Sequence, residues 1–143
     1  NAGTGGNASL PVTVPADAAF GPATLSATAA DVLHTRSASA TATVVEPISV
    51  SLATSATIIA VRGTVTLTAT VLRQGGIPAA GASVTFSVRR SNGGVSNVTA
   101  TANANGVATV NYRAQQKGSY TATSTATSSG ATATSNTVSF TVQ

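Results

Sequence analysis

The sequence contains no cysteine, methionine or tryptophan, and its aromatic residues are limited to three Phe and two Tyr. Without cysteine there is no disulfide framework and no thiolate metal site. His34 is the single histidine, and a lone imidazole cannot assemble the three or four ligands of a zinc site, so we predict that it lies in a hairpin loop. No apolar run reaches about 18 residues, so we expect no transmembrane segment. No metal and no cofactor are expected.

Acidic residues are nearly as scarce, and their distribution is uneven. Asp17, Asp31 and Glu46 all fall within residues 1–47, which carry one basic residue and a net charge of −2. Residues 48–143 hold six basic residues and no carboxylate side chain. This excludes paired-carboxylate hydrolysis, an acid-assisted triad and an oxygen-rich calcium cage there, and no serine lies in a nucleophile-elbow motif. We therefore predict a protein that is not an enzyme, with no catalytic, cofactor-binding or metal-binding residues.

What the chain does have is Ala, Val, Thr and Ser in alternation, which is typical of half-buried strands. The alternation recurs in short blocks separated by Gly, Pro, Asn or Ser, at residues 48–52, 64–71, 83–89, 96–102, 107–114, 120–126 and 138–142. About seven strands over some 96 residues match a β-sandwich module. The expected core is Val65, Leu67, Val84, Phe86, Val110, Tyr112, Tyr120 and Phe140.

Three motifs within residues 48–143 resemble those of a bacterial Ig-like domain of the invasin and intimin type. Residues 76–86 read GIPAAGASVTF and match the pattern G-x-P-x-x-G-x-x-V-x-F. Residues 101–110 read TANANGVATV and match T-x-x-x-G-x-A-x-V with one extra residue, and residues 117–122 (KGSYTA) match the entry to the final hairpin. The resemblance covers one complete module and implies an all-β, antiparallel immunoglobulin-like β-sandwich. It implies little about function.

Residues 1–47 resemble the closing half of a preceding Ig-like repeat. About three strands are expected there, around residues 11–15, 21–27 and 38–45, where an independent sandwich needs about seven. Either the chain is a piece of a longer tandem array, or a strand from a neighbouring subunit completes the half-module. The chain begins at Asn1 without a signal sequence, as a processed protein or a fragment would. The linker around Pro47 has no Gly/Ser spacer, so it should couple the two modules semi-rigidly.

Basic residues near strand ends are the candidate contact site for an anionic partner, namely Arg89, Arg90, Arg113 and Lys117. If they share one end of the sandwich, they form a patch suited to anionic surface glycans or to the acidic segment of a neighbouring subunit. The alternative is that they only keep the surface soluble. Nucleic acid is not expected, because no aromatic residues remain for base stacking. Asn7 and Asn97 fit the N-glycosylation pattern, which occurs by chance in such a sequence.

Three classes of function remain open. The first is a structural or adhesive Ig-like module of a secreted or surface-anchored bacterial protein, located outside the cell and in contact with adjacent Ig-like modules. The second is a subunit of an extracellular filament or pilus, assembled by β-strand complementation between neighbouring chains. The third is an accessory module of a secreted carbohydrate-active enzyme, for which the sequence lacks the exposed aromatics that stack on sugar rings.

Overall fold

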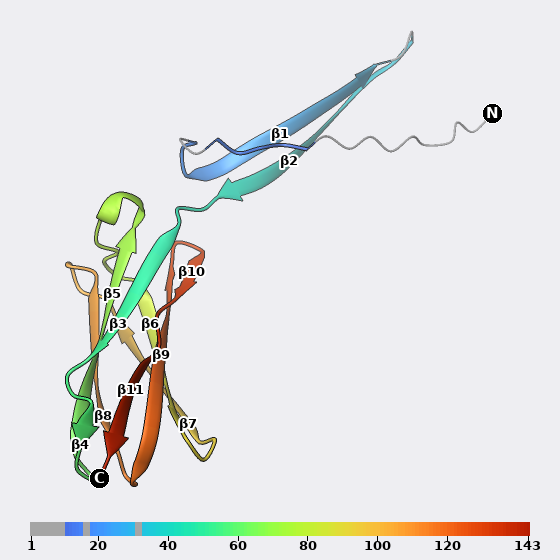
Figure 1. The fold of residues 1–143 in the computed structure, drawn as a ribbon. Coiled ribbons are helices and arrows are strands. Elements are labelled where there is room, and N and C mark those ends of the chain that lie inside the picture. The colour runs from blue at the N-terminus through green and yellow to red at the C-terminus, as the bar shows by residue number, and fades with distance from the viewer. Residues whose placement is uncertain (1–10, 16–17, 31–32) are drawn as a thin grey trace. The chain divides into compact units, whose positions relative to one another are not determined.

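A computed structural model of the protein describes residues 11–15, 18–30 and 33–143. The chain divides into two compact units, Asn1–Val44 and Val45–Gln143, which we call unit 1 and unit 2. The sequence placed this boundary three residues later, after residue 47. Strands dominate both units (Figure 1), and the only helical element of the described residues is a 3-10 turn at Gln74–Gly76.

Unit 2 is a sandwich of two β-sheets. The smaller sheet has the strand order β3–β5–β8, with bounds Ile48–Thr54, Thr64–Arg73 and Val107–Arg113. The larger sheet has the order β4–β11–β9–β6–β7, with bounds Ile58–Ile59, Val138–Val142, Gly118–Ser128, Ser83–Arg90 and Val95–Thr101. A further strand, β10 (Ala131–Thr134), pairs with β9 beyond the stretch that β11 occupies. All pairs are antiparallel except the short parallel pair β11–β4.

Every strand region predicted for residues 48–143 is a strand in the structure. Thr/Ser and aliphatic residues alternate between solvent and core, as in β5, where Val65, Leu67, Ala69 and Val71 are all buried. The prediction missed β4 and β10. The first is only two residues long and the second carries only Ala and Thr, so neither gives an aliphatic alternation.

The core lies between the two sheets and contains seven of the eight predicted residues in buried positions. Tyr120 and Phe140 stack with ring centroids 5.1 Å apart, and Tyr112 meets both rings edge-on. Tyr112 is the exception to the predicted core, because it is half-buried. It stands one residue before the end of β8, where the sandwich opens to solvent.

Two side chains fix the closing strands to the rest of the sandwich. The Tyr120 hydroxyl donates to the backbone oxygen of Gln116, 2.8 Å away, the tyrosine corner of immunoglobulin-type sandwiches. Asn136 lies between β10 and β11 and bonds the backbone of Leu52 twice, with its amide oxygen 2.9 Å from the nitrogen and its amide nitrogen 3.0 Å from the oxygen. It therefore acts as a strand partner for β3, an edge strand of the smaller sheet.

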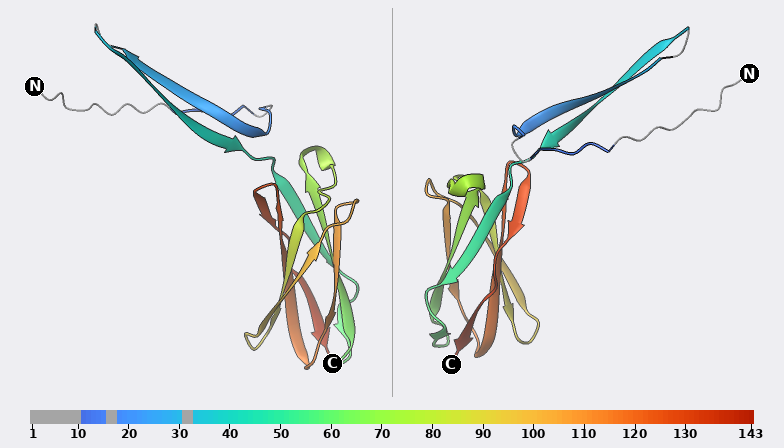
Figure 2. Two further views of the ribbon diagram at one scale, coloured as in Figure 1. Left: turned by 180° about the vertical axis from the view of Figure 1, so that it is seen from behind. Right: turned by 45° about the horizontal axis from the view of Figure 1, so that its top comes forward.

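The chain enters and leaves the sandwich at opposite ends. Ile48, the first residue of β3, pairs with Arg73 at the end of β5, whereas Val142, the last residue of β11, pairs with Gly118 at the start of β9. The views in Figures 1 and 2 agree that β3 begins at one end of the sandwich and that the chain terminus C lies at the other.

In unit 1 the described residues form one two-stranded sheet, in which β1 (Gly21–Ala30) pairs antiparallel with β2 (Thr35–Val44) over ten residue pairs. The strand predicted at residues 11–15 is not formed. Pro11 and Pro15 bound that segment, and neither has an N–H for a ladder hydrogen bond. Asn7, Asp17 and Asp31 lie outside the described residues.

Candidate functional site

The four basic residues singled out in the sequence lie at one end of unit 2. Arg89 and Arg90 end β6, and Arg90 pairs with Tyr120 near the start of β9. Lys117 directly precedes Gly118, the first residue of β9. Arg113 ends β8 and pairs with Thr64 at the start of β5. Because the four-residue connection from β8 to β9 joins these points, the ends of β6 and β8 share one pole, which we call the basic end.

The basic end also includes Arg62, which the sequence analysis did not single out. Arg62 lies in the turn before β5 with φ of 64°, and its backbone oxygen accepts a 2.9 Å hydrogen bond from Nε of Arg113. This bond holds Arg113 alongside the turn. Of the six basic residues in unit 2, only Arg73 lies elsewhere, at the opposite end of β5. Gly63 directly after Arg62 indicates a turn at a strand end, and this signal could have added Arg62 to the candidate contact residues.

Arg90 occupies a groove of about 180 Å³ at this end. Arg90 is half-buried as a residue, and its guanidinium donates an exposed hydrogen bond to the side-chain oxygen of Gln116 in the β8–β9 connection. The groove is lined by Val88, Arg90, Gly94, Val95, Ser96, Tyr112, Gln115, Gln116 and Tyr120. A second hollow of about 190 Å³ lies beside it, with Arg89 and Arg90 both on its wall. Arg90 therefore borders both hollows, while Arg89, Arg113 and Lys117 are exposed.

Tyr112 gives the groove a neutral hydrogen-bond donor. Burial raises the pKa of the Tyr112 hydroxyl above its ordinary 10.0, and the neighbouring Tyr120 raises it further, while Arg90 opposes both. The hydroxyl is therefore protonated at neutral pH. Together with the guanidinium of Arg90, it presents donors and no carboxylate, a composition that suits an anion.

Among residues 45–143 the only carboxylate side chain is Glu46, at the start of the unit. Within the described part of the chain, no three His, Cys, Asp or Glu side chains gather as a metal site would require. Asn97, one of the two glycosylation-pattern residues, is exposed on β7.

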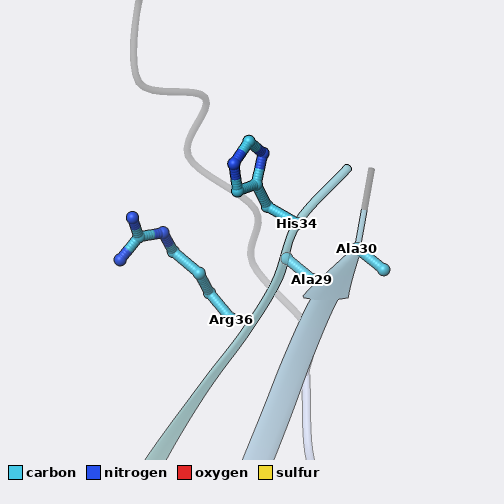
Figure 3. Close-up of a pocket in the computed structure, with 4 residues that line it drawn as sticks. All are labelled: Ala29, Ala30, His34 and Arg36. Carbon is cyan, nitrogen blue, oxygen red and sulfur yellow. The ribbon is translucent and has the colours of Figure 1, made fainter. Parts of the chain in front are cut away.

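A separate hollow of about 320 Å³ lies at the far end of the β1–β2 hairpin, lined by Ala29, Ala30, His34 and Arg36. His34 lies in the connection from β1 to β2, directly before Thr35, and is exposed, as the sequence predicted for a hairpin loop residue. Figure 3 shows the side chain of His34 just before β2 and the side chain of Arg36 near the start of that strand. Among the described residues, the lining of this hollow holds two nitrogen-bearing side chains and no acid.

No helix in the described residues is long and apolar enough to cross a membrane. No protein-family model matches the chain, and a comparison with curated proteins gave no match.

Several solved structures are similar in fold. A tetra-tandem repeat in the extending region of a large adhesion protein aligns with a TM-score of 0.52 at 21% identity, over 90% of this chain and 33% of that one. Dimeric latent PorU from Porphyromonas gingivalis aligns with a TM-score of 0.54 at 14% identity, over 87% of this chain and 12% of that one. The CARDB domain of PF1109 from Pyrococcus furiosus, in complex with di-metal ions, aligns with a TM-score of 0.45 at 18% identity, over 68% of this chain and 89% of that one.

At identities this low, the likeness to the adhesion and PorU structures shows the fold alone. The chain spans a third of the adhesion structure and about an eighth of the PorU structure. The topology of unit 2, its tyrosine corner and the likeness to the adhesin repeats define an all-β protein with an immunoglobulin-like sandwich.

Proposed function

We propose that the chain is a non-enzymatic extension and contact module of a secreted or surface-anchored bacterial protein. The observation that carries this proposal is the placement of the entry and exit of unit 2 at opposite ends of a closed sandwich. Modules with this geometry add length when they are joined in tandem. The fold likeness to tandem repeats from an adhesion protein supports the same role, and the order of the three sequence motifs supports the invasin and intimin type.

The connection between the two units supports a spacer that resists bending. It runs from Val44 to Ile48, without a Gly/Ser spacer, and Pro47 restricts the residue before it to extended conformations. We infer that the two units are semi-rigidly coupled.

Small-angle scattering of tandem fusions tests this spacer role. We expect the maximum dimension of one, two and four fused copies of residues 1–143 to grow by a constant increment per copy. A matched series with about twelve Gly/Ser residues inserted after Val44 should instead approach growth with the square root of the number of copies. Indistinguishable curves for the two series would show that the natural connection is flexible.

Light scattering of the single chain distinguishes the spacer from the filament alternative. A spacer predicts the monomer mass at every concentration. Salt-sensitive oligomers or fibres would contradict it and would favour a subunit assembled by strand complementation, because β1 and β2 are exposed along almost their whole length.

We also propose that the basic end contacts anionic polymers such as surface glycans, or the acidic segment of a neighbouring module. Five cations with no acidic side chain among them support this contact. Retention on immobilised polygalacturonate should fall as salt rises, since exposed charges are screened within about 10 Å at 0.1 M salt. The triple change Arg89→Gln, Arg90→Gln and Lys117→Gln should abolish retention, whereas Arg36→Gln with Arg73→Gln should weaken it far less. Equal losses would show that only net charge matters.

A further inference from the structure

The β1–β2 hairpin of unit 1 repeats the register of the β9–β11 pair of unit 2. Each pair opens on a glycine in a conformation that other residues rarely adopt, Gly21 with φ of 129° and Gly118 with φ of 133°. Gly21 pairs with Val44, and Gly118 pairs with Val142. Two residues further in, Ala23 pairs with Ala42 where Tyr120 pairs with Phe140. The two strand pairs therefore share one register over the five residue pairs of β9 and β11, which correspond to residues 21–25 and 40–44 of the hairpin.

The correspondence identifies which face of the hairpin is the inner one. In β9 the inward residues Tyr120, Ala122, Ser124 and Ala126 are buried beneath the β3–β5–β8 sheet. Their equivalents in β1 are Ala23, Leu25, Ala27 and Ala29. With the facing residues of β2 they make a surface that we call the alanine face, comprising Ala23, Leu25, Ala27, Ala29, Ala38, Ala40 and Ala42. Arg36 stands opposite Ala29 at its far end.

The opposite face of the hairpin carries almost only hydroxyls, at Thr24, Ser26, Thr28, Ser37, Ser39, Thr41 and Thr43. This division into one apolar and one polar face is what a strand pair needs when one side is covered by another sheet. Yet every residue of the alanine face is exposed, Leu25 by 38%. Val12 borders it across a hollow of about 420 Å³ and is itself 59% exposed.

One edge of the hairpin is also unpaired among the described residues. In unit 2, β9 is paired on both sides, with β11 along one edge and β6 along the other. In unit 1, β1 has only β2. An isolated two-stranded sheet is marginally stable in water, and a free strand edge is a template for another strand. Within the described part of unit 1, the hairpin thus lacks two things that unit 2 supplies: a strand along this edge and a covering sheet.

We propose that the alanine face and the free edge of β1 form a docking surface for one kind of partner, the opening strands of another Ig-like repeat. One strand of this partner would pair along β1 as β6 pairs along β9, and a three-stranded sheet would cover the alanine face as β3–β5–β8 covers β9 and β11. This inference rests on the proposed role as a tandem module. Because Ala23 and Ala42 replace a tyrosine and a phenylalanine, the partner sheet must carry bulkier side chains at those two places than unit 2 does.

The test grafts the opening strands of unit 2 onto the hairpin. Residues 48–117 are fused directly ahead of residues 21–143, so that Lys117 precedes Gly21 as it naturally precedes Gly118. Because small residues at the two aromatic positions leave a void, a second fusion also carries Ala23→Tyr and Ala42→Phe, which restores the stacked pair. Amide hydrogen exchange in β1 and β2 is compared with that in residues 1–143 alone. In the second fusion we expect exchange to slow by at least about a hundredfold, since covered strands open only with their sandwich.

Two matched substitutions separate the alanine face from the hydroxyl face. In the second fusion, Leu25→Asp should abolish the protection, because it places a charge beneath the covering sheet. Thr24→Asp, on the adjacent residue of the same strand, should preserve it. Equal effects of the two changes, or exchange in β1 and β2 as fast as in the single chain, would overturn the proposal.

A second copy of the chain is the competing occupant. If residues 1–143 alone dimerise with rising concentration and Leu25→Asp abolishes the dimer, the alanine face is a homodimer surface and the proposal is wrong. The scattering of tandem fusions reads the stiffness of the connection and is unaffected by the graft. If exchange in β1 and β2 of the second fusion stays as fast as in the single chain while the tandem fusions lengthen by a constant increment, the docking surface is wrong and the spacer role stands.

Discussion

At the level of single residues, Ser124 shows that the two-residue period of a strand can predict burial even where the side chain is polar. This serine interrupts the apolar series Tyr120, Ala122 and Ala126 of β9. The side chain is fully buried all the same, and its hydroxyl has no hydrogen-bond partner among the described residues. Burial here follows from the period of the strand and overrides the polarity of the residue.

Replacing this hydroxyl should stabilise unit 2. A buried polar atom without a partner costs about 1–3 kcal/mol, so Ser124→Ala is expected to raise the free energy of unfolding by about 1 kcal/mol. The equivalent position in unit 1 is already an alanine, Ala27. Urea unfolding measures the change, with the exposed Ser119→Ala as a control that should stay within about 0.5 kcal/mol. A loss of stability in Ser124→Ala would reveal a partner for the hydroxyl.

Tyr112 makes stability depend on alkaline pH. Burial holds the pKa of its hydroxyl above 10.0 in the folded chain, and unfolding returns it to that ordinary value. The unfolded state therefore ionises first, and this contribution to stability is full below about pH 10 and is lost as pH rises through the folded pKa. Tyr112→Phe should flatten the decline in melting temperature above pH 10 without changing it near pH 7. If the melting temperature of Tyr112→Phe declines above pH 10 as steeply as that of the unchanged protein, Tyr112 is not the source of the decline.

At the level of elements, the alternation of apolar and polar residues predicted seven of the nine strands of unit 2 and missed β4 and β10. It did not predict which strands are neighbours, since pairing depends on long-range packing that no local pattern records. The basic end illustrates this limit. Four of its cations could be chosen from strand ends, but that they share one pole, together with Arg62, required the topology. Asn136 was likewise missed, because its two bonds reach 84 residues back along the chain to Leu52.

The two motif glycines, Gly81 and Gly106, should differ in their tolerance of a side chain. Both have positive φ, 78° and 73°. A Cβ at Gly81 would meet no heavy atom within 4 Å, whereas one at Gly106 would lie 2.4 Å from the backbone oxygen of Val71. That oxygen accepts a 3.0 Å bond from the N–H of Ala79. Gly106 thus allows two segments of backbone to approach closely.

We expect Gly81→Ala to cost about 1–2 kcal/mol, the strain of a left-handed alanine. Gly106→Ala should cost about 1–3 kcal/mol more, because the displaced Val71 carbonyl loses its buried hydrogen bond. Urea midpoints of the two variants give the comparison directly. Equal losses would mean that the backbone around residue 106 relaxes freely.

At the level of the whole molecule, unit 2 is a sandwich of two sheets, whereas the described part of unit 1 is a single two-stranded sheet. The core of unit 2 is supplied by its own two sheets, and its described strands leave no inner face uncovered. Unit 1 has the alternation and the register of a closing strand pair, but no strand of its described residues covers the alanine face. Sequence alone indicated a partial module. Its inner face became identifiable only when Gly21 and Gly118 were compared in three dimensions, because alanine alternating with serine and threonine gives a weak contrast.

Heat unfolding of the single chain should therefore report unit 2 alone. Unfolding enthalpy near 60 °C is about 0.7 kcal/mol per residue, so cooperative loss of residues 45–143 absorbs about 70 kcal/mol and loss of all 143 residues about 100 kcal/mol. Calorimetry on residues 1–143 is expected to give the lower value, with one transition that coincides with tyrosine fluorescence, since Tyr112 and Tyr120 both lie in unit 2. The hairpin contributes little because two uncovered strands bury almost no apolar surface. An enthalpy near the higher value would mean that unit 1 melts as part of the same cooperative structure, and its alanine face would then have to be covered within the single chain.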